Sequence, residues 1–251
     1  MFFVIGVDDT DSATGMGVAD TGEFAIQLGR LIEERRFGHL LGVTRHQLLQ
    51  QAEVRFTSEN RAACLFIEGD KEARRDLELT CREFLLRKSA PDSNPGFALA
   101  AWSNLSAAVE AWGRQAKRTR LSRLTAVDLA RAEGLAAAGF HGHGGGVIGA
   151  LSAVGLRASG NDGVFIWLPG LEQVKGVLTL PQLLRLCAIE NVANFRGRVP
   201  LERDLIDLGD APQVILRNQQ SHLLLEACER ADPCQWRACT PAEVADISPG
   251  I

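Results

Sequence analysis

The chain has 251 residues, of which 46% are hydrophobic and 23% are charged, and its formal net charge is −4. This composition is typical of a globular protein with one large domain or two small ones. The negative charge excludes a general polyanion binder, so contact with nucleic acid would need a local basic patch. No apolar run reaches the ~18 residues of a membrane span, and residues 1–7 lack the basic head of a secretion signal. We expect a cytoplasmic protein.

The predicted elements of the N-terminal part mix strands and helices. A buried strand at 2–7 is followed by a helix that opens at the capping sequence DTGE, residues 20–23. Then come strands at 39–44 and 62–68, a helix at 71–88, a loop at 90–96, a strand at 97–102, and helices at 104–118 and 125–138, the last with Thr125 as its N-cap. A glycine-rich loop, an apolar helix and a strand at 164–168 complete this part.

The C-terminal part begins after Pro169-Gly170, where we place a domain boundary. Residues 1–170 then form one domain, and residues 171–251 form a small α+β lobe. This lobe is predicted to hold a helix at 180–194 and a hairpin of 213–217 with 222–227 that turns at NQQS. The whole chain is therefore predicted to be α/β, with an α+β mixed sheet.

Three carboxylates, Asp8, Asp9 and Asp11, follow the first strand directly. Asp9 and Asp11 are two residues apart, so on an extended segment they project to one side. Hard oxygen ligands suit Mg²⁺, which takes one or two carboxylates together with substrate phosphates. The alternative is an Asp-rich turn whose side chains cap backbone N–H groups. A second alternative is a haloacid-dehalogenase phosphatase loop, which the sequence matches only in part because Ala13 replaces its Thr or Val.

The second candidate site is the glycine-rich loop of residues 141–149, HGHGGGVIG. Consecutive glycines let backbone N–H groups turn towards an anion, and the N-terminus of a helix adds partial positive charge. We expect glycine-only backbone angles at Gly145. The spacing G-x-G-x-x-G at 144–149 would suit a dinucleotide only after a strand, and the preceding stretch is predicted to be helical. A flexible hinge is the alternative.

Two further groups of residues are open to two readings. Five cations, Arg114, Lys117, Arg118, Arg120 and Arg123, stand together without an acidic residue between them. They form either a solvated helix face or a contact with the phosphates of a nucleotide or RNA. In the C-terminal part the spacing of His222, Cys228, Cys234 and Cys239 lacks the tight C-x2–4-C pair of structural zinc sites. Free thiols in a reducing compartment are favoured there.

Four stretches, in this order, resemble the catalytic domain of the tRNA(Ile) 2-agmatinylcytidine synthetase family, TiaS. They are IGVDDTDSATGM at 5–16, VRFTSENRAACLFIEG at 54–69, SNPG at 93–96 and HGHGGGVIGALSAVG at 141–155. The resemblance implies a kinase-type fold and an enzyme that uses ATP and Mg²⁺ to activate a tRNA cytidine, which agmatine then attacks. It implies that Asp8, Asp9 and Asp11 serve the metal and the phosphates.

The predicted site combines this resemblance with the loop and cation patterns. Asp8, Asp9 and Asp11 are the catalytic candidates, with Asp9 and Asp11 on the metal. The nucleotide site is predicted to contain Thr10, Ser12, Gly15, Asn60, Asn94, Gly96, Lys117, Arg118, His141, His143, Gly144, Gly145 and Gly146. The cofactors are ATP and Mg²⁺, and the acceptor is RNA or a small molecule.

The sequence also departs from the family. The family pattern Gly-Met-Cys-Thr-Thr is replaced by Gly15-Met16-Gly17-Val18-Ala19. The family's oligonucleotide-binding fold and zinc ribbon do not follow, so we expect a stand-alone, TiaS-like protein. The expected function is phosphoryl or nucleotidyl transfer from ATP. The alternatives are a nucleotide-binding module without catalysis, and a metal-dependent phosphatase.

Overall fold

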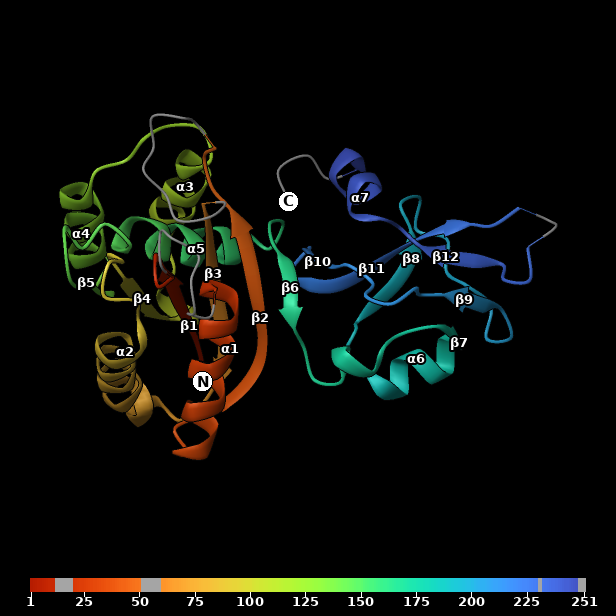
Figure 1. Cartoon of the computed structure of the whole chain (residues 1–251), viewed down its shortest axis with the longest axis horizontal. Helices are drawn as coiled ribbons and strands as arrows, with labels where there is room; N and C mark the ends of the chain where they lie inside the picture. The colour runs from red at the N-terminus through yellow and green to blue at the C-terminus, as the bar shows by residue number, and fades with distance from the viewer. Residues whose placement is uncertain (12–19, 51–59, 230–231, 248–251) are drawn as a thin grey trace. The chain divides into compact units, whose positions relative to one another are not determined.

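The computed structural model describes residues 1–11, 20–50, 60–229 and 232–247 (Figure 1). The chain divides into two compact units, Met1–Ser159 and Gly160–Ile251. The division falls before the boundary predicted at residue 170, so the strand at 164–167 belongs to the second unit. None of the described helices is long and apolar enough to cross a membrane. Ser12, Gly15 and residues 17–19, which bear on the site, lie outside the described residues.

The first unit is built on an antiparallel sheet in the strand order β5-β4-β1-β3-β2. The strands are β1 (Phe2–Asp8), β2 (His39–Gln47), β3 (Arg61–Glu68), β4 (Gly96–Ala101) and β5 (Ala136–Gly139). The central strand β1 is buried from residue 3 to residue 7 because helices pack on both faces of the sheet. The predicted strands at 2–7, 39–44, 62–68 and 97–102 are confirmed.

Helices of this unit cover the two faces of the sheet. They are α1 (Thr21–Glu34), α2 (Arg74–Lys88), α3 (Ala107–Ala116), α4 (Arg123–Ala132) and α5 (Val147–Ser159), with short 3₁₀ helices at Lys71–Ala73 and Trp102–Asn104. On one face α3, α4 and α5 bury Val109, Ala126 and Leu151 against the sheet. On the other face α1 and α2 meet through Phe24 and Phe84, whose rings are 4.8 Å apart.

The second unit holds a smaller sheet in the order β6-β10-β11-β12-β9-β7, and β8 pairs with β11 in parallel. Its strands are β6 (Val164–Trp167), β7 (Val177–Thr179), β8 (Asn191–Asn194), β9 (Leu205–Asp207), β10 (Val214–Arg217), β11 (Gln220–Ala227) and β12 (Trp236–Ala238). Helices α6 (Leu180–Leu186) and α7 (Pro241–Ile247) and the 3₁₀ helix Leu171–Gln173 complete it. The predicted hairpin is confirmed, and its two turn residues, Asn218 and Gln219, have φ of 49° and 66°. These angles suit a two-residue hairpin turn.

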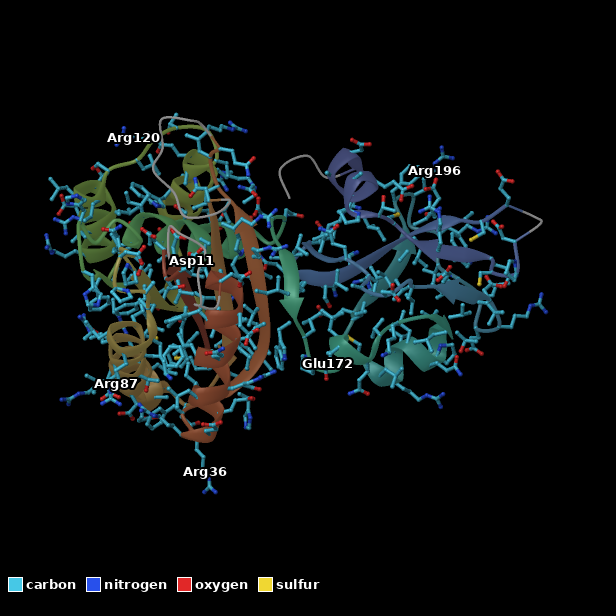
Figure 2. All side chains as sticks on the ribbon, viewed as in Figure 1. Asp11, Arg36, Arg87, Arg120, Glu172 and Arg196 are labelled. Atoms are coloured by element: carbon cyan, nitrogen blue, oxygen red, sulfur yellow. The ribbon has the colours of Figure 1, made fainter. Side chains whose placement is uncertain are left out.

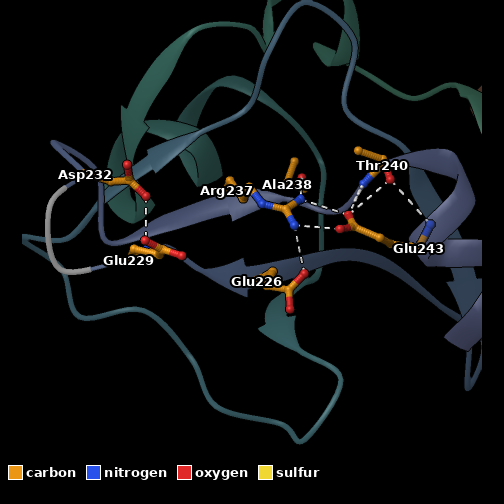
Figure 3. Close-up of polar contacts among 7 residues, drawn as sticks. All are labelled: Glu226, Glu229, Asp232, Arg237, Ala238, Thr240 and Glu243. Carbon is orange, nitrogen blue, oxygen red and sulfur yellow. Dashed lines mark hydrogen bonds and ion pairs between the residues drawn. The ribbon is translucent and has the colours of Figure 1, made fainter.

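An ionic network fixes the short helix α7 to the sheet of the second unit (Figure 3). Arg237 on β12 donates hydrogen bonds to Glu243 of α7 at 2.5 and 2.8 Å and to Glu226 of β11 at 2.9 Å. Glu243 also accepts from the backbone N–H of Thr240 at 2.8 Å. Beneath these groups Val244 is buried with Ile215, Leu224 and Cys239.

Three predictions of secondary structure are wrong in detail. The helix predicted at 125–138 is α4, which begins at Arg123 with Ser122 as its N-cap and ends at Ala132. Residues 136–138, predicted to be helical, belong with Gly139 to β5 because they pair with β4 at the edge of the sheet. The helix predicted at 180–194 ends at Leu186, and β8 follows it. The predicted fold class, a mixed α/β chain, is confirmed.

Candidate nucleotide and metal site

Most of the predicted site residues lie at one end of the strands in the sheet of the first unit, which we call the ligand edge. Asp8 at the end of β1 pairs with Gly96 at the start of β4, and Gly96 pairs with Gly139 at the end of β5. On the other side of β1, Arg61 at the start of β3 pairs with Gln47 at the end of β2. The segments that leave this edge are therefore the acidic loop, the loop before β4, the glycine-rich loop and the residue Asn60.

The acidic loop is held between two other segments. The Thr10 carbonyl accepts from the Ala90 N–H at 3.0 Å, which ties the loop to the segment before β4. The Thr10 hydroxyl donates to Thr21 Oγ1 at 3.2 Å, and the Thr21 hydroxyl donates to Asp11 Oδ1 at 3.2 Å. Thr21 is the first residue of α1, so Asp11 lies at the N-terminus of that helix, where partial positive charge favours a carboxylate. Asp11 is 8% exposed, and Figure 2 labels its place in the first unit.

The backbone of this loop differs from the prediction. Asp9 has φ of 55°, so it is not part of an extended segment, and the argument that Asp9 and Asp11 project to one side by strand alternation is wrong. The chain instead turns at Asp9 in the left-handed region, which aspartate tolerates better than most residues. The directions of the Asp9 and Asp11 carboxylates therefore depend on this turn and not on strand alternation.

Asp8 points from β1 towards the first turns of α5. A Cβ atom on Gly149 would lie 1.9 Å from Asp8 Oδ2, so only glycine leaves room for this carboxyl. Burial raises the pKa of Asp8 well above its usual range, and the charges of Asp9 and Asp11 raise this pKa further, while a backbone hydrogen bond from Asp9 lowers it in part. Three acidic groups that repel one another in this way are a suitable environment for a cation.

The glycine-rich loop is fixed by Asn94. The side-chain Oδ1 of Asn94 accepts from the His143 N–H at 2.8 Å, and its backbone carbonyl accepts from the Gly146 N–H at 2.8 Å. Gly142 and Gly144 have φ of 38° and 59°, in the left-handed region that favours glycine. Gly146 is needed for a different reason, since a Cβ there would lie 2.6 Å from the Asp8 carbonyl oxygen. Gly145 is not among the residues with positive φ, so the expectation of glycine-only angles there is wrong.

The loop leads directly into α5. The carbonyl groups of Gly145 and Gly146 accept from Ile148 and Ala150, which starts the helix. A helix N-terminus behind a glycine-rich loop is a common anion site. His141 and His143 are exposed at the outer side of this loop.

The reason given against dinucleotide binding is wrong, because a strand, β5, does precede the glycine-rich loop. The dinucleotide fold is nevertheless not formed. It requires a parallel βαβ unit, whereas β5 pairs with β4 in an antiparallel arrangement.

Asn60 and the cations belong to the β2 side of the same edge. The Asn60 side chain donates to the Leu49 carbonyl at 2.5 Å, so its amide nitrogen is engaged by the protein itself. The Leu49 N–H in turn donates to the Ala116 carbonyl at 3.2 Å, which places the end of α3 beside β2. Lys117 and Arg118 follow directly, and Arg118 is exposed.

The remaining cations of this group lie on the helices α3 and α4 and the turn between them. Arg114 pairs with Glu110 at 3.2 Å, as the solvated-face alternative predicts for a helix surface. Arg120 lies in the turn that leads to α4, at the upper surface of the first unit in Figure 2. Of the five cations, Lys117 and Arg118 come directly after Ala116, which is hydrogen-bonded to Leu49 at the ligand edge.

The donor set fits a magnesium ion that is completed by phosphate and water. Among the described residues, no group of three or more His, Cys, Asp or Glu side chains is arranged to hold a metal by itself. Mg²⁺ does not need such a group, since one or two carboxylates with substrate phosphates are its usual ligands. Asp9 and Asp11 stay the predicted metal ligands, and Ser12, whose hydroxyl would stand beside them, lies outside the described part.

Sequence reasoning missed two features of this edge. Thr21 links Thr10 to Asp11 through its hydroxyl group. In the sequence it is marked only as the first residue of a predicted helix. The contact of Asp8 with Gly149 joins segments that are remote in the chain, although the glycine itself was counted in the predicted loop.

Comparison with known proteins identifies the fold. No family model matches this sequence, and no curated protein matches it. Solved structures of TiaS do: apo TiaS, described as a tRNA agmatidine synthetase, is 25% identical, with a TM-score of 0.52, over 62% of this chain and 35% of that chain. A complex of TiaS with its isoleucine tRNA and ATP gives 25% identity, a TM-score of 0.53, and coverage of 62% and 36%. A complex of TiaS with the same tRNA, AMPCPP and agmatine gives 25% identity and a TM-score of 0.52, over 62% of this chain and 36% of that chain.

The chain thus spans about a third of the length of the TiaS chains that it matches. The matched share of this chain, 62%, is close to that of the first unit, residues 1–159. The four sequence stretches that resemble TiaS and the observed fold agree with each other. The chain therefore contains a TiaS-like α/β domain.

Proposed function

We propose that the first unit binds ATP with Mg²⁺ and transfers a phosphoryl or nucleotidyl group to an acceptor. The observation that carries the proposal is the close approach of Asp8 to Gly149. A Cβ atom added to Gly149 would lie only 1.9 Å from Asp8 Oδ2. This close approach joins the acidic loop to the helix that follows the glycine-rich loop. Carboxylates for a metal and backbone N–H groups for phosphates are the two halves of a triphosphate site.

Each half has a distinct task in this proposal. Asp9 and Asp11 would hold Mg²⁺, which neutralises phosphate charge during transfer. The loop Gly144–Gly146 would receive the phosphates through the Gly145 N–H and the N-terminus of α5, because the N–H groups of Gly144 and Gly146 donate to the carbonyls of His141 and Asn94. Asn94 also fixes that loop in place through its bond to His143. Asp8 lies between the two halves, where it would orient the acidic loop. Further contacts to the nucleotide are proposed for Thr10, Ser12, Gly15, Asn60, Gly96, His141, Lys117 and Arg118.

The acceptor is proposed to be RNA or a small molecule. The TiaS structures carry tRNA, ATP or AMPCPP, and agmatine, and this chain covers only part of TiaS. Lys117 and Arg118 favour an anionic acceptor because the Leu49–Ala116 hydrogen bond holds the end of α3 at the ligand edge. A polyanion would be attracted there even though the chain as a whole is negatively charged.

The proposal is tested first by binding and then by turnover. ATP with Mg²⁺ at ~100 times its dissociation constant should stabilise the protein by about 2.7 kcal/mol, which corresponds to a rise in Tm of roughly 5–10 °C. ATP with a chelator should give a clearly smaller rise. ATP consumption is then followed with RNA, with agmatine, and with neither.

The outcomes separate the alternatives. Binding without turnover under all conditions would indicate a nucleotide-binding module. Release of phosphate from a simple phosphomonoester, without any effect of ATP on Tm, would indicate a phosphatase. Identical Tm shifts with Mg²⁺ and with chelator would refute the metal half of the proposed site.

A further inference from the structure

All five residues of a turn in the second unit, 195–199 with the sequence FRGRV, are exposed. Its conformation is fixed by Asn194, whose Oδ1 accepts from the N–H groups of Arg196 at 3.0 Å and Arg198 at 2.8 Å. The backbone of Asn194 adds two bonds, to Arg198 and Gly197, both 2.9 Å long. The turn is therefore held in one shape before any partner arrives, which lowers the entropy cost of binding.

Planar cationic and aromatic groups are paired on this turn. The guanidinium of Arg196 lies 5.2 Å from the centre of the Phe195 ring, and that of Arg198 lies 5.5 Å from the centre of the Trp236 ring. Phe195 is 50% exposed, so half of its surface is accessible to a ligand. Arg196 points away from the ribbon at the upper surface of the second unit (Figure 2).

The carboxylate of Asp204, whose pKa responds to the charge of Arg198, makes no ion pair with these cations. Asp204 accepts from Trp236 Nε1 and from the Leu201 N–H, both at 2.9 Å. These bonds lower the pKa of Asp204, and the charges of Arg203 and Arg198 lower it further. Within the described part of the chain, no ion pair within 4.0 Å involves Arg196 or Arg198. Their charge is thus available to an anionic partner.

We propose that the 195–199 turn, with Leu201 beside it, is a binding surface for single-stranded nucleic acid. The ring of Phe195 offers a stacking face for a base, and the two arginines offer planar donors for phosphates. Val199 and Leu201 are 54% and 59% exposed and add apolar contact area for sugars and bases. An acidic peptide would use the cations but has no use for an open stacking face, so nucleic acid fits better. The inference lies in the second unit and does not depend on ATP binding by the first.

The test measures binding of a fluorescent single-stranded RNA of mixed sequence, about 20 nucleotides long and therefore longer than a usual single-strand site. The full chain is titrated at about 50 and 200 mM salt, and we expect micromolar binding that weakens steeply with salt. Phe195→Ala should weaken binding about tenfold through lost stacking. Arg196→Glu should weaken it at least as much and reduce the salt slope by about one.

Arg185→Glu is the matched control. Arg185 is an exposed arginine of α6, which lies at the lower side of the second unit in Figure 1, whereas Arg196 is at its upper side in Figure 2. This control should bind RNA almost as wild type does. Since all three side chains are exposed or half-exposed, the variants should melt within a few degrees of wild type, and Tm is measured for each.

Two results would overturn the proposal. One is equal RNA affinity of wild type, Phe195→Ala and Arg196→Glu. The other is an equal loss in Arg185→Glu and Arg196→Glu together with no effect of Phe195→Ala, which would show only general charge attraction. The shift of Tm with ATP reports on the first unit and is measured separately, so a failure here and a failure of the ATP site are distinguishable.

Discussion

Replacing Gly149 with alanine is expected to lower turnover by on the order of 100-fold while the protein stays folded. The new Cβ would lie 1.9 Å from Oδ2 and 2.5 Å from Cγ of Asp8. To reach van der Waals contact the carboxyl oxygen must move by roughly 1.5–2 Å. A displacement of about 1 Å at a site that positions reacting groups costs on the order of 100-fold in rate.

The stability of this variant follows from two opposing effects. Alanine is favoured over glycine inside a helix by about 1 kcal/mol. A displaced Asp8 side chain that leaves its preferred rotamer costs about 0.5–1.5 kcal/mol. The two effects nearly cancel, so Tm should change by no more than about 2–4 °C.

Gly155→Ala on the same helix provides the contrast. Its Cβ would lie 2.1 Å from the backbone carbonyl oxygen of Val109, which cannot rotate away. We expect this variant to melt well below wild type, with activity lost only in proportion to the folded fraction. The assay is ATP turnover with Mg²⁺ beside a melting curve for each protein. Wild-type turnover in Gly149→Ala, or a melting curve as low as that of Gly155→Ala, would contradict the account of Asp8.

Three further predictions follow from the contacts of the site and of α7. Gly145→Val should weaken ATP binding in a calorimetric titration without lowering Tm, because no atom lies within 4 Å of its Cβ position. Asn94→Ala removes the hydrogen bond from the His143 N–H and should weaken ATP binding by up to about tenfold. Glu243 has its pKa lowered from 4.5 to about 2, mainly by Arg237. The second unit should therefore lose stability as pH falls from about 4.5 towards 2, and a pH series of melting curves should show a smaller loss for Glu243→Gln.

Much of the framework of the first unit follows from local sequence signals. The helix α1 starts where DTGE predicts, with Asp20 Oδ1 accepting from the Glu23 N–H at 2.7 Å. By contrast, β5 has the sequence Ala-Ala-Ala-Gly, and alanine favours helices. Only pairing with β4, which is remote in the chain, makes it a strand, and single-sequence propensity does not contain that information.

The site shows the same limit. The acidic and glycine-rich loops were predicted because each is a local pattern of charge or of backbone freedom. The turn at Asp9, by contrast, is held by two hydrogen bonds of the neighbouring Thr10 to other segments. Its carbonyl accepts from the Ala90 N–H, and its hydroxyl donates to Thr21. The contact of Asn94 with the nucleotide stays a prediction, and the structure adds that its Oδ1 fixes the glycine-rich loop. Tertiary contacts of this kind are not visible in one sequence.

The most direct test of the central claim, that the acidic loop holds a metal for ATP, is the affinity for ATP in wild type and Asp11→Asn, each with Mg²⁺ and with chelator. Asparagine keeps the oxygen that accepts from Thr21, so the fold and Tm should be retained. Wild type should bind ATP much more tightly with Mg²⁺ than with chelator, and Asp11→Asn should lose that difference together with turnover. If Asp11→Asn keeps the full effect of Mg²⁺, or melts far below wild type with activity in proportion to folded protein, Asp11 is a structural cap and the claim is wrong.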